Sequence, residues 1–470
     1  MDASGPPTRV SASVRPTDDA MLRRFLLGLA EGLNAAMEPV DRIRDIMLEV
    51  ARAYGRSDVD FVVLPTVILV ETGSGDTGKV ALRSTLDPSF RFDQIQALYD
   101  LVAKARTGSI APVDGIARLN AIGSMRPRYR WPVRVLGHAI LTTGLALLLA
   151  PTWQGALVSF VLGAFLGLGK LIRSPTIQLV FPVVAAFLCA LAVFLVAPYI
   201  AIGDPIRLMI APLATFLPGG VLTTATRELA AGQMIAGASR LVTGLVQLAL
   251  LAFGILAAGT LVGVGSSTYL PLEADGQLPW WVGAVGVLLF AAGNLLHFSA
   301  PGRTFGWLLL ALAVAYVGQT VGQALAGSTI SGFIGALAMT PVVLWIGSLK
   351  HGVPAQLAFL PAFWLLVPGA AGLVGLTEAI GSDRGMEDFV AALVSVMSIA
   401  LGVLFGSALY RVVHHGAEEL ADFHIDMPAA IDEVVKPRFW ARLLPWRHDS
   451  VWRRIRRGEA STPSSESPNT

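Results

Sequence analysis

Two glutamates follow proline-glycine pairs at the same distance in two separate apolar stretches of the chain. Pro218-Gly219 precedes Glu228, and Pro368-Gly369 precedes Glu378, with the glutamate ten residues after the proline in both copies. A carboxylate in apolar surroundings binds a proton more readily than one in water, so it can load and release a proton during transport. Glu228 and Glu378 are therefore the candidate proton-coupling residues.

Each proline-glycine pair also predicts a break in a membrane helix. Proline lacks the backbone donor that a helix needs, and glycine weakens a helix, so Pro218 with Gly219 and Gly220 should interrupt it. Unwound backbone inside a membrane is tolerated only where it lines a cavity or is covered by protein. Two breaks in corresponding positions therefore predict a substrate site between two halves. The alternative is that both are kinks or turns at the ends of spans.

Polar side chains inside the apolar stretches could bind a small zwitterion. Hydroxyl and amide groups offer the donors and acceptors that an ammonium and a carboxylate need, although most such groups in membranes only bond neighbouring helices. The candidate substrate-binding residues besides the two breaks are Thr223, Thr224, Asn294, Gln319 and Gln323. Arg227 and Arg240 are candidates for a salt bridge or a gate. Glu228 beside Arg227 could equally be an ordinary interfacial ion pair, and Glu378 could face outside water.

Other chemistries are not predicted. No His, Asp and Glu cluster has metal-ligand spacing, and Cys189 is the single cysteine, so we expect no metal and no cofactor. The glycine-rich segment Thr72–Lys79 does not match a phosphate-binding loop, because Val80 follows the lysine where serine or threonine is required. No histidine or cysteine precedes His138, so the polar region before it lacks an evident nucleophile and base. We therefore expect no enzyme.

The elements that must position these residues are membrane helices. The chain of 470 residues is 54% hydrophobic and only 14% charged, with a mean hydropathy of +0.63. Such a composition is typical of an integral membrane protein. The predicted spans, each long enough to cross about 30 Å of hydrocarbon, cover residues 135–150, 155–172, 176–198, 206–223, 238–263, 279–298, 305–325, 328–348, 353–376 and 388–410.

The predicted fold class is therefore an α-helical integral membrane protein with ten transmembrane helices arranged as a 5+5 inverted repeat. Residues 133–265 would form the first repeat and residues 279–410 the second, entering the membrane in the opposite sense because five is odd. With both termini in the cytoplasm, most loop arginines and lysines fall on the inner side, as the positive-inside rule requires. The small net charge of +2 predicts no nucleic-acid partner.

A small α+β cytoplasmic domain is predicted over residues 18–132, after a disordered leader at residues 1–17. Apolar spacing predicts helices at Ala20–Ala36, Pro39–Tyr54, Phe92–Arg106 and Pro112–Gly123, and β-branched residues predict strands at Phe61–Glu71 and Lys79–Ser84. Residues 411–470 would be a cytoplasmic tail with a disordered end. Its basic, tryptophan-containing part, Pro437–Arg457, could lie on membrane lipid or pack on the domain.

The segment Phe216–Leu241, FLPGGVLTTATRELAAGQMIAGASRL, resembles the signature of the threonine/serine exporter family. A second proline-glycine segment, LLVPGAAGLVGLTEAIGS at Leu365–Ser382, strengthens the resemblance, although it has Ala370 and Thr377 where the first copy has Gly220 and Arg227. The family implies proton-motive-force-coupled export of L-threonine and L-serine across a bacterial cytoplasmic membrane. The residues to which it assigns the motif are Pro218, Gly219, Gly220, Arg227, Glu228, Gly232, Arg240, Pro368, Gly369 and Glu378.

Three alternatives stay open at this point. The same fold could export a dicarboxylate such as succinate, which would need additional cationic groups facing the cavity. The protein could instead belong to another functional class, as a membrane-anchored enzyme or as a sensor whose cytoplasmic domain binds a solute. A homo-oligomer is also compatible with the sequence.

Overall fold

The computed structural model describes residues 16–73, 79–84, 90–150, 152–172, 174–265, 278–366, 373–374, 376–377 and 385–415. The chain divides into two units, Met1–His414 and His415–Thr470, and the description below concerns the first. The predicted basic segment Pro437–Arg457 and nearly all of the predicted leader lie outside the described residues. The predicted site residues Pro368, Gly369 and Glu378 lie outside them as well.

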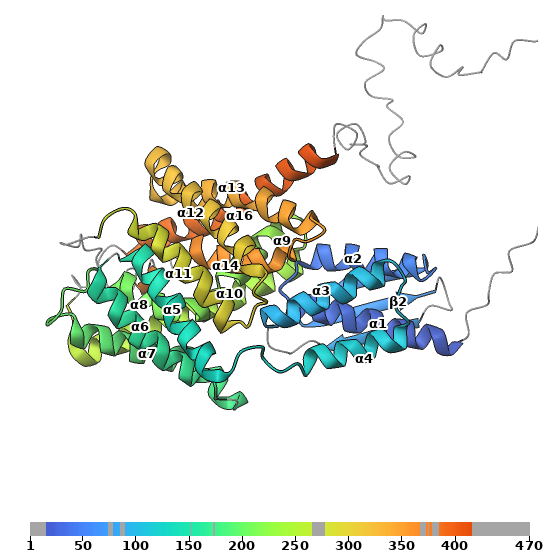
Figure 1. The fold of residues 1–470 in the computed structure, drawn as a ribbon, viewed down its shortest axis with the longest axis horizontal. Coiled ribbons are helices and arrows are strands. Elements are labelled where there is room, and N and C mark those ends of the chain that lie inside the picture. The colour runs from blue at the N-terminus through green and yellow to red at the C-terminus, as the bar shows by residue number, and fades with distance from the viewer. Residues whose placement is uncertain are drawn as a thin grey trace, which may run out of the picture. The chain divides into compact units, whose positions relative to one another are not determined.

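Four helices and a three-stranded sheet precede the apolar part of the chain (Figure 1). The helices are α1 (Pro16–Ala35), α2 (Val40–Ala53), α3 (Phe92–Arg106) and α4 (Pro112–Gly123), and the antiparallel strands, in the order β1-β2-β3, are β1 (Val59–Val63), β2 (Val67–Thr72) and β3 (Lys79–Ser84). Val59, Phe61 and Val63 alternate with exposed residues along β1, so one face of the sheet is buried against α1 and α2. Gly55 lies in the turn directly after α2 with a φ of +75°, which suits its missing side chain.

The predicted strand Phe61–Glu71 is wrong, because it is two strands joined by a tight turn. The amide of Leu64 donates to the carbonyl of Val67 at 2.8 Å, and Phe61 pairs with Val70 across the hairpin. Pro65 lies in the turn, where its fixed φ is favourable and its missing N–H is not needed. The sheet therefore has one strand more than the sequence predicted.

The apolar part is built from helices that overlap the predicted spans, except that the predicted span 206–223 is divided between two helices and the helix in 353–376 ends at Leu366. Their bounds are α5 (Trp131–Leu149), α6 (Trp153–Gly169), α7 (Pro175–Val196), α8 (Pro205–Leu213), α9 (Gly219–Ala230), α10 (Met234–Val262), α11 (Val282–His297), α12 (Thr304–Ala326), α13 (Ser328–Ser348), α14 (Ala355–Leu366) and α16 (Gly385–His415). Five stretches, in α5, α10, α12, α13 and α16, are long and apolar enough to cross a membrane, and the bent pair α8 and α9 would make a sixth. Apolar stretches of α6, α7, α11 and α14 are shorter.

Large apolar side chains on the outside of this bundle lie at helical spacing. On α6, Leu157, Val161 and Phe165 are exposed, and on α16 Met397, Leu401 and Phe405 are exposed. Residues four apart share one face of a helix, so these are continuous apolar stripes that water would not favour. Contact with lipid tails accounts for them.

Glycines let α5 and α11 approach closely. A Cβ added at Gly144 would lie 2.4 Å from the amide nitrogen of Phe290, and one added at Gly293 would lie 2.2 Å from that of Leu141. Gly137 faces Leu296 in the same way. As residue numbers rise along α5 they fall along α11, so the two helices run antiparallel, with small residues at their contact.

Candidate functional site

The predicted break at Pro218 is present. Helix α8 ends at Leu213, a 3₁₀ turn covers Ala214–Phe216, and α9 begins at Gly219 after a bend of 71°. Proline at 218 cannot donate to a helix, so the carbonyls before it need other partners. The side-chain amide of Gln247, on α10, donates to the carbonyl of Phe216 at 2.7 Å. The unwound backbone is therefore covered by protein, as a break inside a membrane requires.

A crevice lies beside the first turns of α9. It is a partly open hollow of about 290 Å³, a volume that includes open solvent at its mouth, and it is lined by Pro39, Thr223, Thr224, Arg227, Gln356, Phe359, Phe363 and Val403. Three of these residues come from α9, three from α14, one from α16 and one from the start of α2. The lining therefore combines two threonines, an arginine and a glutamine with apolar residues, a combination typical of sites for small polar ligands.

The structure separates the predicted substrate residues into two groups. Thr223, Thr224 and Arg227 line the crevice, and Gly219 and Gly220 are buried one turn away at the start of α9. Asn294 is buried but donates to the carbonyl of Phe290 within its own helix. Gln319 is half-buried and Gln323 exposed on α12, and neither lines the crevice.

Glu228 and Arg240 form a buried ion pair between α9 and α10. Nε of Arg240 lies 3.1 Å from Oε2 of Glu228, and the two side chains are 7% and 0% exposed. The other oxygen, Oε1, accepts a hydrogen bond from the backbone amide of Val40 at 3.1 Å. Arg240 also donates to the side-chain oxygen of Asn34, on α1, at 3.0 Å. The pair therefore ties the membrane helices to the helices that precede them.

Glu38, between α1 and α2, makes a second tie. Its Oε2 accepts hydrogen bonds from the amide of Gln356, on α14, at 2.7 Å and from the hydroxyl of Tyr99, on α3. Burial and the neighbouring charge of Glu38 hold the pKa of Tyr99 well above its usual range. The phenol consequently stays protonated and remains a donor to Glu38.

The residues from Glu38 to Asp41 therefore contact membrane helices from both parts of the chain. Glu38 is bonded to α14 and Val40 to α9, while Pro39 lines the crevice. Asp41 lies 3.9 Å from Arg227, whose guanidinium also borders the crevice. We call residues 38–41 the bridging segment. It lies over the crevice and joins its two walls.

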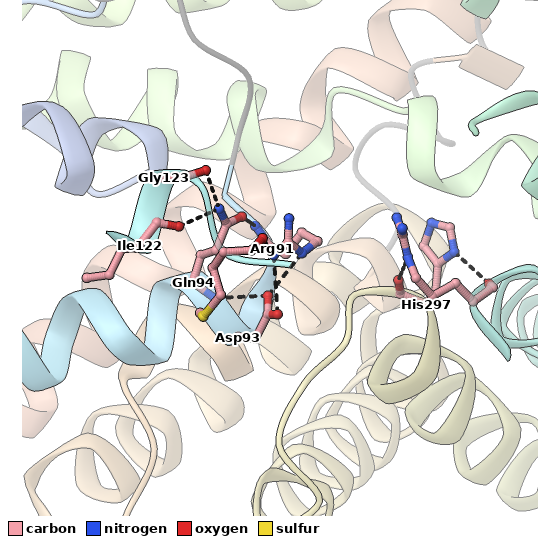
Figure 2. A network of polar contacts seen from close by, with 8 residues as sticks. Arg91, Asp93, Gln94, Ile122, Gly123 and His297 are labelled. Carbon is pink, nitrogen blue, oxygen red and sulfur yellow. Dashed lines mark hydrogen bonds and ion pairs between the residues drawn. The ribbon is translucent and has the colours of Figure 1, made fainter. Parts of the chain in front are cut away.

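A polar network fixes the end of α4, from which the chain leads to α5 (Figure 2). The amide of Gln94 donates to the carbonyls of Ile122 and Gly123, and Arg91 donates to the carbonyl of Met125 at 2.7 Å while it pairs with Asp93. At the first turn of α5, the imidazole of His297 is 3.0 Å from the carbonyl of Arg134. These bonds position the linker between α4 and α5.

Basic side chains gather on the other side of the break. The imidazole of His138, on α5, lies 2.7 Å from the carbonyl of Gly163 and 3.0 Å from the hydroxyl of Thr215. The ammonium of Lys170 bonds the same hydroxyl and lies 4.5 Å from the centre of the Phe216 ring. The ring of His297 is 4.7 Å from that of His138. Among the described residues, no three His, Cys, Asp or Glu side chains could together hold a metal ion.

Sequence reasoning missed this basic cluster and the bridging segment. It assigned no role in the site to Lys170, His138 or Thr215. Thr215 stands three residues before Pro218, so its closeness to the break was a signal that could have been used. Nothing in the sequence indicated that Glu38 and Val40 contact membrane helices.

Comparison with known proteins adds a family match. Residues 24–262, just over half of the chain, match the family model described as "Putative threonine/serine exporter". An uncharacterized protein of Schizosaccharomyces pombe is 23% identical over 386 residues, which cover 77% of this chain and 45% of that protein. The chain thus spans less than half the length of this relative. No solved structure matches the chain significantly.

Proposed function

The chain belongs to the threonine/serine exporter family, and from this premise we propose that it is a secondary active transporter that exports L-threonine and L-serine. The proton motive force would drive the movement. The protein would act without catalysis and without a cofactor, as a multi-pass protein of a bacterial cytoplasmic membrane with both termini in the cytoplasm. Its partners would be the amino acid, protons and membrane lipid. The proposal is compatible with a homo-oligomer.

One observation carries the proposal, namely the crevice beside the broken helix. The break at Pro218 leaves the first amides of α9 without partners inside the helix, and Thr223, Thr224 and Arg227 of the same helix line the crevice. The amino end of a helix favours a carboxylate, and hydroxyls accept hydrogen bonds from an ammonium. Threonine and serine carry both groups. The predicted second break at Pro368-Gly369 would complete this site from the other part of the chain.

We propose ten crossings in a 5+5 inverted repeat, with residues 133–265 and 279–410 as its halves. The antiparallel contact of α5 with α11, the first helices of the proposed halves, supports this arrangement. Added Cβ atoms would meet across the contact in a reciprocal way, since one at Gly144 lies 2.7 Å from the carbonyl of Gly286 and one at Gly286 lies 2.9 Å from that of Gly144. Reciprocal contact is what a two-fold axis between the helices would produce. The cytoplasmic domain would occupy residues 18–132.

Proton coupling would use Glu228, with Glu378 as the corresponding group of the second half. Glu228 is buried against Arg240, so protonation of the carboxylate would leave the guanidinium without its partner. That loss would favour a rearrangement of α9 against α10. Arg240 and Arg227 would thus act as the gating cations beside the site.

Transport in membrane vesicles tests this function. Preloaded radiolabelled L-threonine should leave vesicles containing the protein faster when a proton gradient is imposed. The Glu228→Gln variant should still exchange threonine at equal pH but lose the stimulation by the gradient. Glu71→Gln, on the exposed side of β2, is the matched control. Equal stimulation in the Glu228→Gln variant would remove this residue from the coupling mechanism.

A dicarboxylate exporter of the same fold is the second candidate. It needs cations near the crevice, and the structure has Arg227 at the crevice and Lys170 behind the break. Counterflow with labelled threonine against an excess of unlabelled threonine, serine or succinate separates the two substrates. Uptake driven by succinate alone would favour the dicarboxylate.

A further inference from the structure

Lys170 is a partly buried cation without an acidic partner among the described residues. Every ion pair found in the described parts of the chain involves an arginine and leaves Lys170 out. Its ammonium contacts the hydroxyl of Thr215 and the face of the Phe216 ring. A hydroxyl and an aromatic ring stabilise a cation only weakly compared with a carboxylate.

Among the residues that the structure describes, the surroundings of Lys170 add basic groups and no acid. His138 bonds the same Thr215 hydroxyl, the ring of His297 lies 4.7 Å from that of His138, and the carbonyl of Arg134 bonds His297. An unpaired charge inside a membrane protein is costly, and such residues usually mark the path of an ion or a substrate. The cluster has the composition of an anion site.

The position of Lys170 at the end of α6 explains only part of this arrangement. A cation next to the last carbonyls of a helix is favourable, and Lys170 directly follows Gly169, the last residue of α6. A residue with that role alone would extend its ammonium into water. Here the side chain turns instead to Thr215 in the 3₁₀ turn, three residues before the break.

We propose that Lys170, positioned by Thr215 and His138, is a second binding point for the carboxylate of the transported molecule, on the other side of the break from the crevice. The proposal rests on the proposed transport function and specifies which group of the substrate this cluster recognises. The ammonium of Lys170 would contribute charge and donate a hydrogen bond to one carboxylate oxygen, while it also donates to the hydroxyl of Thr215. His138 holds Thr215 in place through its other contact, with the carbonyl of Gly163.

Ligand-induced thermal stabilisation of the purified full-length protein tests the site without requiring transport. A ligand that binds the folded protein raises its Tm, and the rise grows with the logarithm of the ligand concentration relative to its Kd. The ligands are L-threonine and succinate, each compared with an analogue that lacks the carboxylates, L-threoninol and succinamide. The variants are Lys170→Gln, which removes the charge, and Lys170→Arg, which keeps it. Lys350→Gln, on an exposed turn between α13 and α14, is the matched control.

The expected result is that a carboxylate ligand raises the Tm of the wild type and its carboxylate-free analogue does so only at tenfold or higher concentration. Lys170→Gln should lose this preference, while Lys170→Arg and Lys350→Gln should retain it. The proposal is overturned when no carboxylate ligand stabilises the wild type, or when Lys170→Gln keeps the preference. Should Lys170→Gln fail to fold, Thr215→Val decides, and an unchanged preference in that variant overturns the proposal.

Failure of the transport function would give a different pattern. Vesicles would then show no threonine efflux in response to a proton gradient, while the Tm shift and its dependence on Lys170 would persist. Stabilisation by succinate but not by threonine would retain the carboxylate site and change the proposed substrate.

Discussion

The backbone amide of Val40 donates a hydrogen bond to Oε1 of Glu228 at 3.1 Å, across 188 residues of sequence. The bond joins the first turn of α2 to the last turns of α9. The positive end of the α2 dipole thus lies against a buried carboxylate, which is the favourable orientation. Glu228 is consequently bonded to the polar region before α5 as well as to Arg240, and its substitution should affect both contacts.

Replacement of Glu228 by alanine should destabilise the protein strongly. Arg240 would remain buried without its carboxylate, and loss of one partner of a buried pair typically costs about 3–5 kcal/mol. Hydrogen exchange of the α2 amides should accelerate, because Val40 loses its acceptor. A melting curve and an exchange measurement on the purified protein check this. Glu71→Ala, at an exposed site, should change neither value.

Replacement of Gln356 by alanine should loosen the bridging segment with a smaller effect. Glu38 would lose one of its two donors and retain Tyr99, so we expect a cost of about 1–3 kcal/mol. Exchange of the amides in residues 38–41 should rise more than that in β1. If the amides of the bridging segment exchange at the wild-type rate in this variant, the hydrogen bond from Gln356 to Glu38 does not hold the segment in place.

Alkaline pH should weaken the same contact through Tyr99. Burial and Glu38 raise the pKa of Tyr99 in the folded protein, whereas a tyrosine in the unfolded chain has a pKa of about 10. The folded state holds its proton more tightly, so this contribution to stability is complete below pH 10 and is lost as pH rises above it. The Tyr99→Phe variant should show a shallower decline of Tm between about pH 10 and 11. An unchanged decline would show that other groups cause it.

Bulk at the contact of α5 with α11 should prevent correct packing. The side chain of a Gly144→Val variant would overlap the backbone at Phe290, where a single Cβ would already approach to 2.4 Å. Overpacking typically costs about 1–3 kcal/mol and more where backbone must move. We expect low yield of folded protein by size-exclusion chromatography in detergent. Gly306→Ala on α12, where a Cβ meets nothing within 4 Å, should fold normally.

Thr224 should contribute to substrate affinity and Gln323 should not. Thr224→Val keeps the size of a side chain that lines the crevice and removes one hydroxyl, worth about 1 kcal/mol or a fivefold change in affinity. Gln323→Ala changes an exposed residue away from the crevice. Competition of unlabelled threonine in a counterflow assay measures both. A larger effect at Gln323 would transfer the substrate site to α12.

Local signals in the sequence predicted most helix boundaries. The predicted ranges Phe92–Arg106 and Pro112–Gly123 coincide with α3 and α4, because proline at the start of α4 and the apolar spacing of both helices are properties of short segments. The break at Pro218 was predictable for the same reason. Pro65 carried an equally local signal for a turn, and its neglect merged β1 with β2.

Partners distant in sequence were not predictable. Glu228 was identified as important, yet its contacts with Val40 and Arg240 depend on how α2, α9 and α10 pack, which no spacing rule describes. Lys170 and Thr215 are likewise 45 residues apart. A charged residue at the end of a predicted span looks the same in sequence whether it meets water or a buried hydroxyl.

The bridging segment constrains how the protein can move. Glu38 is bonded to α14 and Val40 to α9, while Pro39 between them borders the crevice. Any displacement of α9 relative to α14 must therefore rupture one of these bonds or drag α2 along with it. The helices that precede the membrane part would therefore move whenever α9 shifts relative to α14. A spectroscopic probe on α2 would detect that movement during each transport cycle.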